Sequence, residues 1–442
     1  GNPAGLGAFR HSTFSITPSL GFGNTESAFC TSPNSCTTSN DTKSNFNISN
    51  IGIVFTNLSD DDSPGTWRAA TYGISFTRLN NFHNRFVYEG VNKNNSMTDY
   101  FVEITNGIPV TELYEEFEQI TSFQGLAYWT VLTDNLTNNT YYSLITGDTV
   151  SQQEIVETMG AQNQWDLAYG ANYDDQLFVG ASLGIASIRY IEKKEYREDV
   201  IADTIENLRY FVLNDFYKTN GTGINFKFGL IYRPSDLIRA GISIQTPTWY
   251  TMSDDYQTDI TAIFDNASIT TIYASREEGS LEGTFSYKLT TPYRLSGGIA
   301  LFAGKKGFFS TDVEYVAYNS ADLKGGDLTT FQGDNKTIKK LYKPAVNLKV
   351  GGELRFEIFR IRAGFALYGD PYNKNVDNLN RKRTYITGGV GMREKDYFLD
   401  IAFVTSKYNS AYTPYTLNDG SEPFATIKNS FTSLLFTFGT VF

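Results

Sequence analysis

Histidine and cysteine are scarce in this sequence, with two residues of each among 442. Structural zinc sites use four Cys or His ligands, and histidine-dependent triads also need a nucleophile and an acid. No Gly-x-Ser-x-Gly segment, phosphate-binding loop or zinc-ligand spacing accompanies His11 and His83. We therefore expect no metal site, no cofactor, no catalytic residues and no enzymatic activity.

Long apolar runs are absent as well. No stretch of 18 or more apolar residues occurs, so the sequence predicts no transmembrane helix. The mean hydropathy of −0.30 would ordinarily indicate a soluble protein. A membrane β-barrel can have the same mean, because its strands alternate lipid-facing with lumen-facing residues. The low mean hydropathy is therefore compatible with a membrane barrel.

Basic residues are fewer than acidic ones, with 37 Lys and Arg against 48 Asp and Glu, and the formal net charge is −11. A surface of this sign repels phosphates, so we do not expect nucleic acid as a partner. The acidic residues gather in apparent loops, such as residues 60–62 and the pair Asp254 and Asp255. Solvated loop charge is the simple explanation of these groups, and binding of divalent cations by the loops is the alternative.

The two cysteines lie close together in a polar stretch. Cys30 and Cys36 are separated by five residues that include the Pro33-Asn34 turn signal. This spacing suits a small disulfide-closed loop in an oxidising compartment. A two-cysteine metal site is the less favoured alternative, because so few histidines are present to complete it.

Aromatic residues and glycine are abundant, with 15% aromatics and 38 glycines. A strand needs about 9–11 residues to cross a membrane, and fourteen segments are suitable. An even number is what single-chain bacterial barrels have. The candidate strands are residues 9–20, 45–57, 67–79, 164–173, 176–190, 221–233, 236–248, 285–302, 307–319, 341–356, 359–369, 383–393, 396–408 and 427–442.

The connections between these segments alternate between long and short. Examples are the long 21–44 and 80–163 and the short 174–175 and 394–395. Outer-membrane barrels have short periplasmic turns and long extracellular loops. The sequence therefore predicts an all-β fold, a 14-stranded antiparallel transmembrane β-barrel with long extracellular loops, some of them helical. We expect it to lie in the bacterial outer membrane with both termini on the periplasmic side.

Alternation within the strands supports this prediction. Leu399 and Ile401 share an apolar face, while Asp400 lies on the other. A turn centred on residues 394–395 would place Leu399 opposite Val390, so that the apolar faces of the hairpin coincide.

The connection 80–163 is too long for a plain loop. Residues 111–121 have apolar residues at helical spacing, with Thr111 as the N-cap. The acidic stretch 197–210 could also be helical. We expect 80–163 to be an extracellular cap inserted within a barrel that comprises residues 9–442.

Several ionisable residues fall on the inner faces of the predicted strands. A turn between residues 357 and 358 places Glu353 opposite Arg362 as a lumenal ion pair, a contact of about 0.2–1 kcal/mol. A salt-bridged filling that holds the barrel shape is the simple interpretation. The functional alternative is that some cations contact a carboxylate ligand, and the best candidates are Lys349, Arg355 and Arg360.

Several motifs, in their order along the chain, resemble one family. They are the Asn2-Pro3-Ala4 opening, the hairpin 229–241, the segments 291–302 and 312–318, and the stretch 361–372. The chain is similar to the outer-membrane channels for long-chain fatty acids and aromatic hydrocarbons, in a form typical of Bacteroidetes.

The resemblance implies a hatch that plugs the lumen, with residues 1–8, including Asn2 and Pro3, as the junction between hatch and barrel. It also implies a sideways exit near a kinked third strand, where Gly73 could permit the kink. The preceding hatch segment is absent from the sequence, and we expect that processing removed it or that it lies outside the sequence given.

The resemblance implies passive uptake of hydrophobic compounds that are fatty-acid-like or aromatic. The expected partners are outer-membrane lipid and a hydrophobic small molecule. The alternative is a non-transporting barrel subunit of a secretion or barrel-assembly complex, with other outer-membrane proteins as partners.

Overall fold

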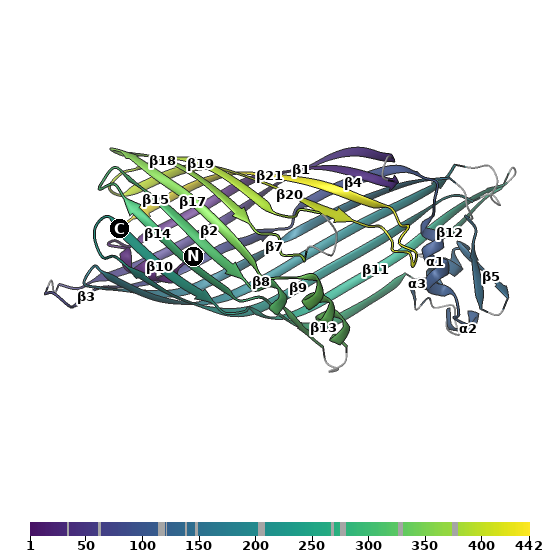
Figure 1. Cartoon of the computed structure of the whole chain (residues 1–442), viewed down its shortest axis with the longest axis horizontal. Helices are drawn as coiled ribbons and strands as arrows, with labels where there is room; N and C mark the ends of the chain where they lie inside the picture. Colours follow the sequence, from purple (N-terminus) through teal and green to yellow (C-terminus); the bar gives the residue numbers. More distant parts are fainter. Residues whose placement is uncertain are drawn as a thin grey trace.

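The computed structural model describes residues 1–32, 35–60, 63–113, 120, 122–137, 139–145, 149–201, 208–266, 269–274, 280–325, 330–373 and 379–442 (Figure 1). One large sheet contains β1 (Thr13–Ser32), β2 (Ser35–Leu58), β3 (Trp67–Asn81), β4 (Asn84–Asn92), β7 (Val150–Tyr173), β8 (Leu177–Val200), β9 (Leu208–Tyr232), β10 (Ile238–Gln245), β11 (Trp249–Asn266), β12 (Ile269–Ala274), β13 (Leu281–Thr290), β14 (Arg294–Phe302), β15 (Gly307–Val316), β16 (Asp322–Lys324), β17 (Ala345–Phe356), β18 (Phe359–Tyr368), β19 (Arg383–Arg393), β20 (Tyr397–Tyr412) and β21 (Phe424–Val441). The remaining elements are β5 (Thr133–Thr137), β6 (Thr140–Ser143), α1 (Met97–Thr105), α2 (Val110–Leu113), α3 (Phe123–Trp129), α5 (Gln332–Leu341), η1 (Pro3–Ala8) and η2 (Tyr318–Ser320).

The sheet is closed into a barrel. Each wall strand pairs antiparallel with the next along the chain, and β1 pairs with β21 from Thr13↔Val441 to Cys30↔Phe424. Several segments belong to one span: β3 with β4, β10 with β11, β12 and β13 with β14, and β15 with β16. The described part of the chain thus forms fourteen spans. The predicted fold class is confirmed.

Two neighbouring spans break at prolines, although the sequence predicts continuous strands there. Pro247 separates β10 from β11, and Pro292 separates β13 from β14. The two breaks are level, because the ladder passes from Gln245↔Arg294 on one side to Trp249↔Thr290 on the other. Proline has no N–H to donate to a ladder, so strands are interrupted where it occurs.

The register of the β19–β20 hairpin differs from the prediction by two residues. Val390 lies opposite Ile401, and Leu399 lies opposite Met392. The pairing is therefore centred on residues 395–396 and not on 394–395. A slip of two residues keeps every side chain on its face, so the predicted apolar outer face of this hairpin is correct.

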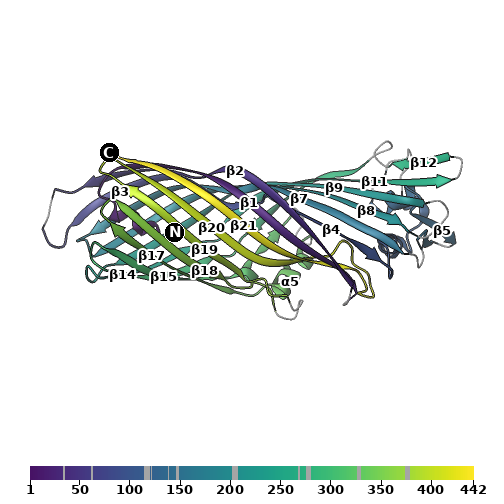
Figure 2. The ribbon, with the colours of Figure 1, turned by 90° about the horizontal axis from the view of Figure 1, so that it is seen from above.

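Several strands are much longer than a membrane crossing requires. β7 and β8 each have 24 residues and β9 has 25, against about 10 for a tilted membrane strand. Their outer halves project beyond the barrel body with β1, β2 and β11 (Figure 2). The predicted loops 21–44 and 191–220 are thus mostly strand, and so is 249–284. Outside the membrane no face of a strand meets lipid, so the alternation of lipid-facing apolar residues used for prediction is missing there.

The helical prediction for 197–210 is wrong where the structure describes it. Residues 197–200 end β8 and residues 208–210 begin β9, whereas 202–207 lie outside the described residues. The predicted helix 111–121 is seen only as α2, since 114–119 and 121 are also outside them. None of the helices in the described part of the chain is long and apolar enough to cross a membrane.

The segment between β4 and β7 covers the inner face of the projecting strands. It contains α1, α2, α3 and the β5–β6 hairpin, at the end of the molecule far from both chain termini (Figure 1). Phe101 of α1 and Leu126 of α3 are fully buried, together with Phe211 of β9 and Ile260 of β11. We call this packed unit, residues 93–149, the cap insertion.

The disulfide between Cys30 and Cys36 is present, as the sequence predicts. It joins β1 and β2 directly across their ladder near the tip of the projecting hairpin, with the two Cα atoms 4.1 Å apart. The bond therefore fixes the end of an arm outside the barrel body.

Candidate functional site

The inner surface of the barrel is the candidate functional site, because the polar side chains converge there. On the paired strands β17 and β18, Glu353 and Arg362 face inward, whereas the neighbouring Leu354 and Ile361 are 57% and 49% exposed on the outer face. This separation is what a strand between lipid and a polar lumen requires.

The N-terminal segment packs inside the wall. The short helix η1 contacts β3, β7, β8 and β9. Asn2 precedes it as the N-cap, and its side-chain Oδ1 accepts a hydrogen bond of 2.9 Å from the backbone N–H of Ala4. The Asn2 amide also donates to the carbonyl oxygens of Ile242 (2.9 Å) and Leu230 (3.2 Å). Pro3 occupies the first helical turn, where its missing N–H is not needed.

A row of glycines makes room for this helix. Gly170, Gly180 and Gly229 are successive register partners on β7, β8 and β9. A Cβ atom on Gly180 would lie 2.4 Å from the carbonyl carbon of Pro3. Side chains at these positions would therefore displace η1 from the wall.

Gly73 has a similar packing role. A Cβ atom there would contact the Leu6 side chain at 3.4 Å. The β2–β3 ladder is regular around it, from Asn50↔Thr77 to Leu58↔Ala69. The ladder therefore has no kink at Gly73. The β2–β3 pairing ends at Asn50↔Thr77 and β4 pairs with β7 alone among the described strands, so the side opening near this span stays a prediction.

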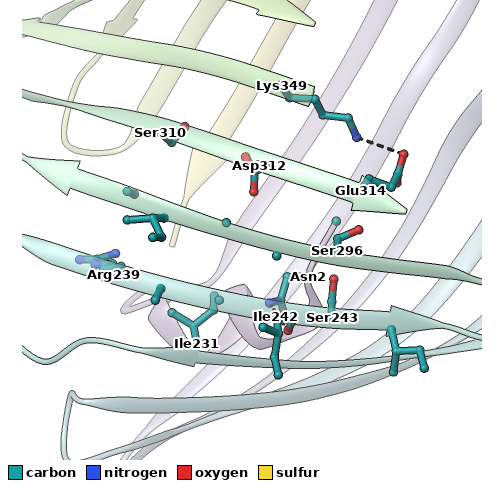
Figure 3. Close-up of a pocket in the computed structure, with 18 of the residues that line it drawn as sticks. Asn2, Ile231, Arg239, Ile242, Ser243, Ser296, Ser310, Asp312, Glu314 and Lys349 are labelled. Atoms are coloured by element: carbon teal, nitrogen blue, oxygen red, sulfur yellow. Dashed lines mark hydrogen bonds and ion pairs between the residues drawn. The ribbon is translucent and has the colours of Figure 1, made fainter. Parts of the chain in front are cut away.

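A cavity of about 470 Å³, the lower cavity, lies beside the N-terminal segment (Figure 3). Three of its four basic side chains lie near acids, whereas the fourth, Arg239, lies over the Phe302 ring at 4.4 Å with no acid within ion-pair distance among the described residues. Lys349 lies 3.6 Å from Glu314, Arg294 approaches the same carboxylate at 4.0 Å, and Lys227 lies 3.0 Å from Asp166. The other labelled residues that line it include Asn2, Arg239, Ser243, Ser296 and Asp312.

The three predicted ligand-binding cations do not come together. Lys349 lines the lower cavity, but the Arg355 guanidinium donates to Glu353 at 2.7 Å. Arg360 donates to the backbone carbonyls of Glu357 and Phe359 at the turn after β17. Strand alternation correctly shows that these residues face inward, but it does not show at which depth or against which acid each one lies.

Glu353 instead connects a small ionic network. It is 8% exposed and accepts hydrogen bonds of 2.7 Å from both Arg355 and Arg362. Arg362 also donates to Asp400 on β20. The network joins β17, β18 and β20 across the intervening β19, so it holds the spacing of four wall strands.

Three further cavities lie in the lumen and under the cap insertion. The upper cavity, of about 380 Å³, is lined by β1, β2, β19, β20 and β21 and by the β3–β4 connection. A smaller cavity of about 270 Å³ shares Leu79 with the upper cavity and Asn2 with the lower one. The cap cavity, of about 440 Å³, lies between α1, α3, the strands β7–β9 and residues 412–416.

One buried carboxylate holds the cap insertion. Glu198 of β8 is completely buried and accepts hydrogen bonds from the Met97 backbone N–H (3.2 Å), from Gln152 Nε2 (2.8 Å) and from the Tyr196 hydroxyl (2.5 Å). The N-cap Ser96 also donates to it. A carboxylate at the N-terminus of a helix is stabilised by the unpaired N–H groups there, so Glu198 anchors α1.

Glu154 of β7 lines the cap cavity. The hydroxyls of Tyr88 (2.5 Å) and Tyr412 (2.7 Å) donate to its carboxylate. Burial raises the pKa of Glu154 to about 7, although the two tyrosine hydrogen bonds and nearby Lys194 favour the charged form. The sequence analysis missed Glu154 and Glu198, because both lie in segments that lack apolar alternation.

Searches with the sequence find no match among models of protein families, and none among curated proteins. Solved structures do match. The toluene transporter TodX of P. putida superposes with a TM-score of 0.51 at 12% identity, over 100% of this chain and 93% of that one. A Pseudomonas aeruginosa FadL homologue gives a TM-score of 0.52 at 12% identity, over 100% and 92%. The chain therefore has the fold of these outer-membrane transporters along its whole length.

Gly180→Ala should displace the N-terminal helix, because the added Cβ would overlap the backbone of residues 3–4. A reporter Ala4→Cys should be unreactive toward maleimide in the parent protein, since Ala4 is fully buried. It should become reactive when Gly180→Ala is added. The matched control is Gly388→Ala, where nothing lies within 4 Å. Equal protection of the reporter in all three proteins would contradict the packing of η1 against Gly180.

Glu353→Ala should lower the thermal midpoint, because it leaves the two arginines without their shared acceptor. The loss of a charged hydrogen-bond acceptor is worth about 1–3 kcal/mol, toward the lower end here since lumenal water screens Arg362. Thermal unfolding in detergent measures the effect. Glu394→Ala, at an exposed turn, is the control, and an unchanged midpoint for Glu353→Ala would argue against the network.

The stability of the folded protein should fall as pH rises from about 4.5 to about 7, because Glu154 keeps its proton in the folded state. The folded protein holds the Glu154 proton up to about pH 7, whereas the ordinary pKa is 4.5, so folding is favoured most below pH 4.5 and least above 7. The difference is roughly 3 kcal/mol. Thermal midpoints across this range should be flatter for Glu154→Gln, while the exposed Glu89→Gln should behave like the parent. Identical slopes for all three would refute the assignment.

Proposed function

We propose that this protein is a passive channel for hydrophobic compounds in the bacterial outer membrane. The structures that share its fold include a transporter named for toluene and a FadL homologue. Both are covered almost completely by this chain, so the proposal concerns the whole barrel and not a fragment of it.

The proposed orientation has both termini on the periplasmic side. Both ends of the chain lie in the half of the molecule away from the cap insertion (Figure 1). The short connections 174–176, 233–237 and 357–358 also belong to that half. Short turns are a property of the periplasmic rim, and the projecting strands with the cap insertion would then face the outside.

The observation that carries the proposal is the row of cavities inside a closed wall. The upper cavity adjoins the smaller cavity at Leu79, and the smaller cavity adjoins the lower cavity at Asn2. The cap cavity lies under the cap insertion and is lined by Tyr412 of β20, four residues from Tyr408, which lines the upper cavity. A hydrophobic compound entering under the cap insertion would find room at each level without crossing the wall.

The outer face supports contact with membrane lipid. Large apolar side chains remain exposed along the body of the barrel, as expected of a surface that lipid covers. Examples are Ile299, Phe359, Ile386, Val390 and Phe403. We propose no catalytic role, no metal and no cofactor for the protein.

Ser296→Trp should abolish uptake, because Ser296 faces the lower cavity (Figure 3) and an indole there would fill the passage. Uptake of a radiolabelled fatty acid and of toluene by cells whose own channel is deleted measures the effect. The matched control is Leu295→Trp, the next residue on β14, which is 50% exposed on the outer face. We expect the control to support uptake and Ser296→Trp to fall to the level of cells without the protein.

Equal uptake by both variants would contradict the proposed channel. The alternative function, a subunit of a secretion or barrel-assembly complex, predicts a different result. In that case the barrel would copurify with other outer-membrane proteins at fixed stoichiometry. Uptake by cells with the parent protein or with either tryptophan variant would equal that of cells without the protein.

A further inference from the structure

A group of exposed lysines lies where the paired strands β13 and β16 meet α5. In Figure 2, α5 lies between the barrel body and the projecting strands. We call this group the lysine patch, and its members are Lys288 of β13, Lys324 of β16 and Lys336, Lys339 and Lys340 of α5. All of these side chains are exposed, in a protein whose formal net charge is −11.

One face of α5 is fixed to the barrel. The Asn335 side chain donates to the carbonyl oxygen of Leu323 (2.8 Å) and accepts from the N–H of the same residue (2.9 Å). Phe331, which precedes the helix, packs against the rings of Phe285 and Tyr287 at 5.6 and 5.8 Å. The three lysines of α5 are spaced i, i+3 and i+4, so they share a different face. The helix thus presents its lysines away from the barrel.

The arrangement of the lysines is unfavourable without an anion. Lys288 and Lys324 are direct register partners, and like charges in that position repel each other. The three lysines of α5 are also neighbours on one helix face. Asp322 lies 3.7 Å from Lys324, and no other lysine of the patch has an ion-pair partner among the described residues. Asp334, in the first turn of α5, is neither three nor four residues from any of the lysines, so it lies on another face.

A groove of about 550 Å³ lies between α5 and the two strands. Lys288 and Lys324 line it, together with Thr251, Ser286 and Gln332. Lysine binds phosphate as a point charge, and hydroxyl and amide groups donate hydrogen bonds to its oxygens. The groove therefore offers both positive charge and neutral donors to a phosphate group.

The lysine patch lies at the level where the hydrocarbon layer ends. β17 follows α5, and its lipid-facing row extends from Val346 to Phe356, both of them exposed. The strand between them is about 33 Å long, or about 25 Å across the membrane at a tilt of roughly 40°, which is the height of the apolar band of outer-membrane barrels. α5 ends at Leu341, just beyond this band. Tyr342 and Tyr372, with ring centroids 4.8 Å apart, are the aromatic residues typical of that interface.

We propose that the lysine patch binds the phosphate groups of a phosphorylated glycolipid in the outer leaflet of the membrane. Clusters of about 4–8 basic residues on an amphipathic helix or beside a membrane span attract anionic head groups. The inference goes beyond transport, because the patch lies outside the lumen, and it takes the choice of leaflet from the proposed orientation. Bound phosphates reduce the repulsion among the lysines and hold α5 at the membrane surface.

The test is equilibrium binding of radiolabelled diphosphoryl lipid A to the full-length protein in a non-ionic detergent, compared with the same lipid after enzymatic removal of its phosphates. The two lipids share their sugars and acyl chains, so a difference in affinity comes from the phosphates. The parent protein should bind the phosphorylated lipid at least about tenfold more tightly, as several lysines near an anionic head group would give. Excess inorganic phosphate should not displace it, because free phosphate has no acyl chains to contact the barrel wall.

The triple variant Lys336→Gln, Lys339→Gln, Lys340→Gln should weaken binding of the phosphorylated lipid at least about tenfold and leave binding of the phosphate-free lipid unchanged. The double variant Lys288→Gln, Lys324→Gln should act in the same direction. The second variant keeps the test decisive if the first one fails to fold.

The matched control removes the same charge from the opposite rim. Lys305, Lys306 and Lys395 are exposed in the short turns after β14 and β19. Their combined replacement by Gln should leave the affinity for both lipids as in the parent protein.

Equal affinity of the parent protein for the two lipids, or displacement of the lipid by inorganic phosphate, would overturn the lipid site. Patch variants that bind like the parent, or a control variant that loses as much affinity as they do, would overturn it as well. None of these results would affect the proposed channel, which is tested by uptake.

Discussion

Closure of the hydrogen-bonded ladder between β1 and β21 is the constraint on which the rest of this structure depends. In hydrocarbon an unpaired backbone N–H or C=O has no water to bond, so a sheet can cross a membrane only if it has no edge. Sixteen register pairs from Thr13↔Val441 to Cys30↔Phe424 remove that edge. Once the sheet is closed, alternate side chains must face lipid or lumen, and the lumen receives the polar half of every strand.

A polar lumen must then be filled and neutralised. Near the N-terminal segment the backbone of η1 fills the lumen, because the glycine row at Gly170, Gly180 and Gly229 lets η1 lie directly on the wall. Farther round the barrel, ion pairs such as Glu353 with Arg362 neutralise the lumenal charges. Burial of a charge is tolerated when it is paired and hydrogen-bonded. Lys227 with Asp166 follows this rule, whereas Arg239 departs from it, because its Nε is buried without a partner among the described residues.

Beyond the barrel body the same strands are surrounded by water and not by lipid. Water can satisfy the backbone there, so neither closure nor an apolar outer face is required. The inner face is instead covered by the cap insertion, whose apolar core includes Phe101 and Leu126. Glu198 is buried in this interface and is held by hydroxyl, amide and backbone donors. The cap insertion is therefore attached partly through a buried carboxylate, unlike the purely apolar contact of the barrel with lipid.

The sequence by itself determined the number of membrane spans, their faces and the Cys30–Cys36 bond, because each depends on residues near one another along the chain. Period-two alternation records which side of a strand meets lipid, and a tight turn fixes which residues of a hairpin lie opposite. The tertiary structure alone decided which strands continue outside the membrane, where η1 lies and which lumenal cations find an acid. Lys227 and Arg239 look alike in sequence, since both are inward-facing cations on barrel strands. Folding of the sheet brings Asp166 of β7 to 3.0 Å from Lys227 but brings no acid within ion-pair distance of Arg239 among the described residues, and no local pattern in the sequence predicts that difference.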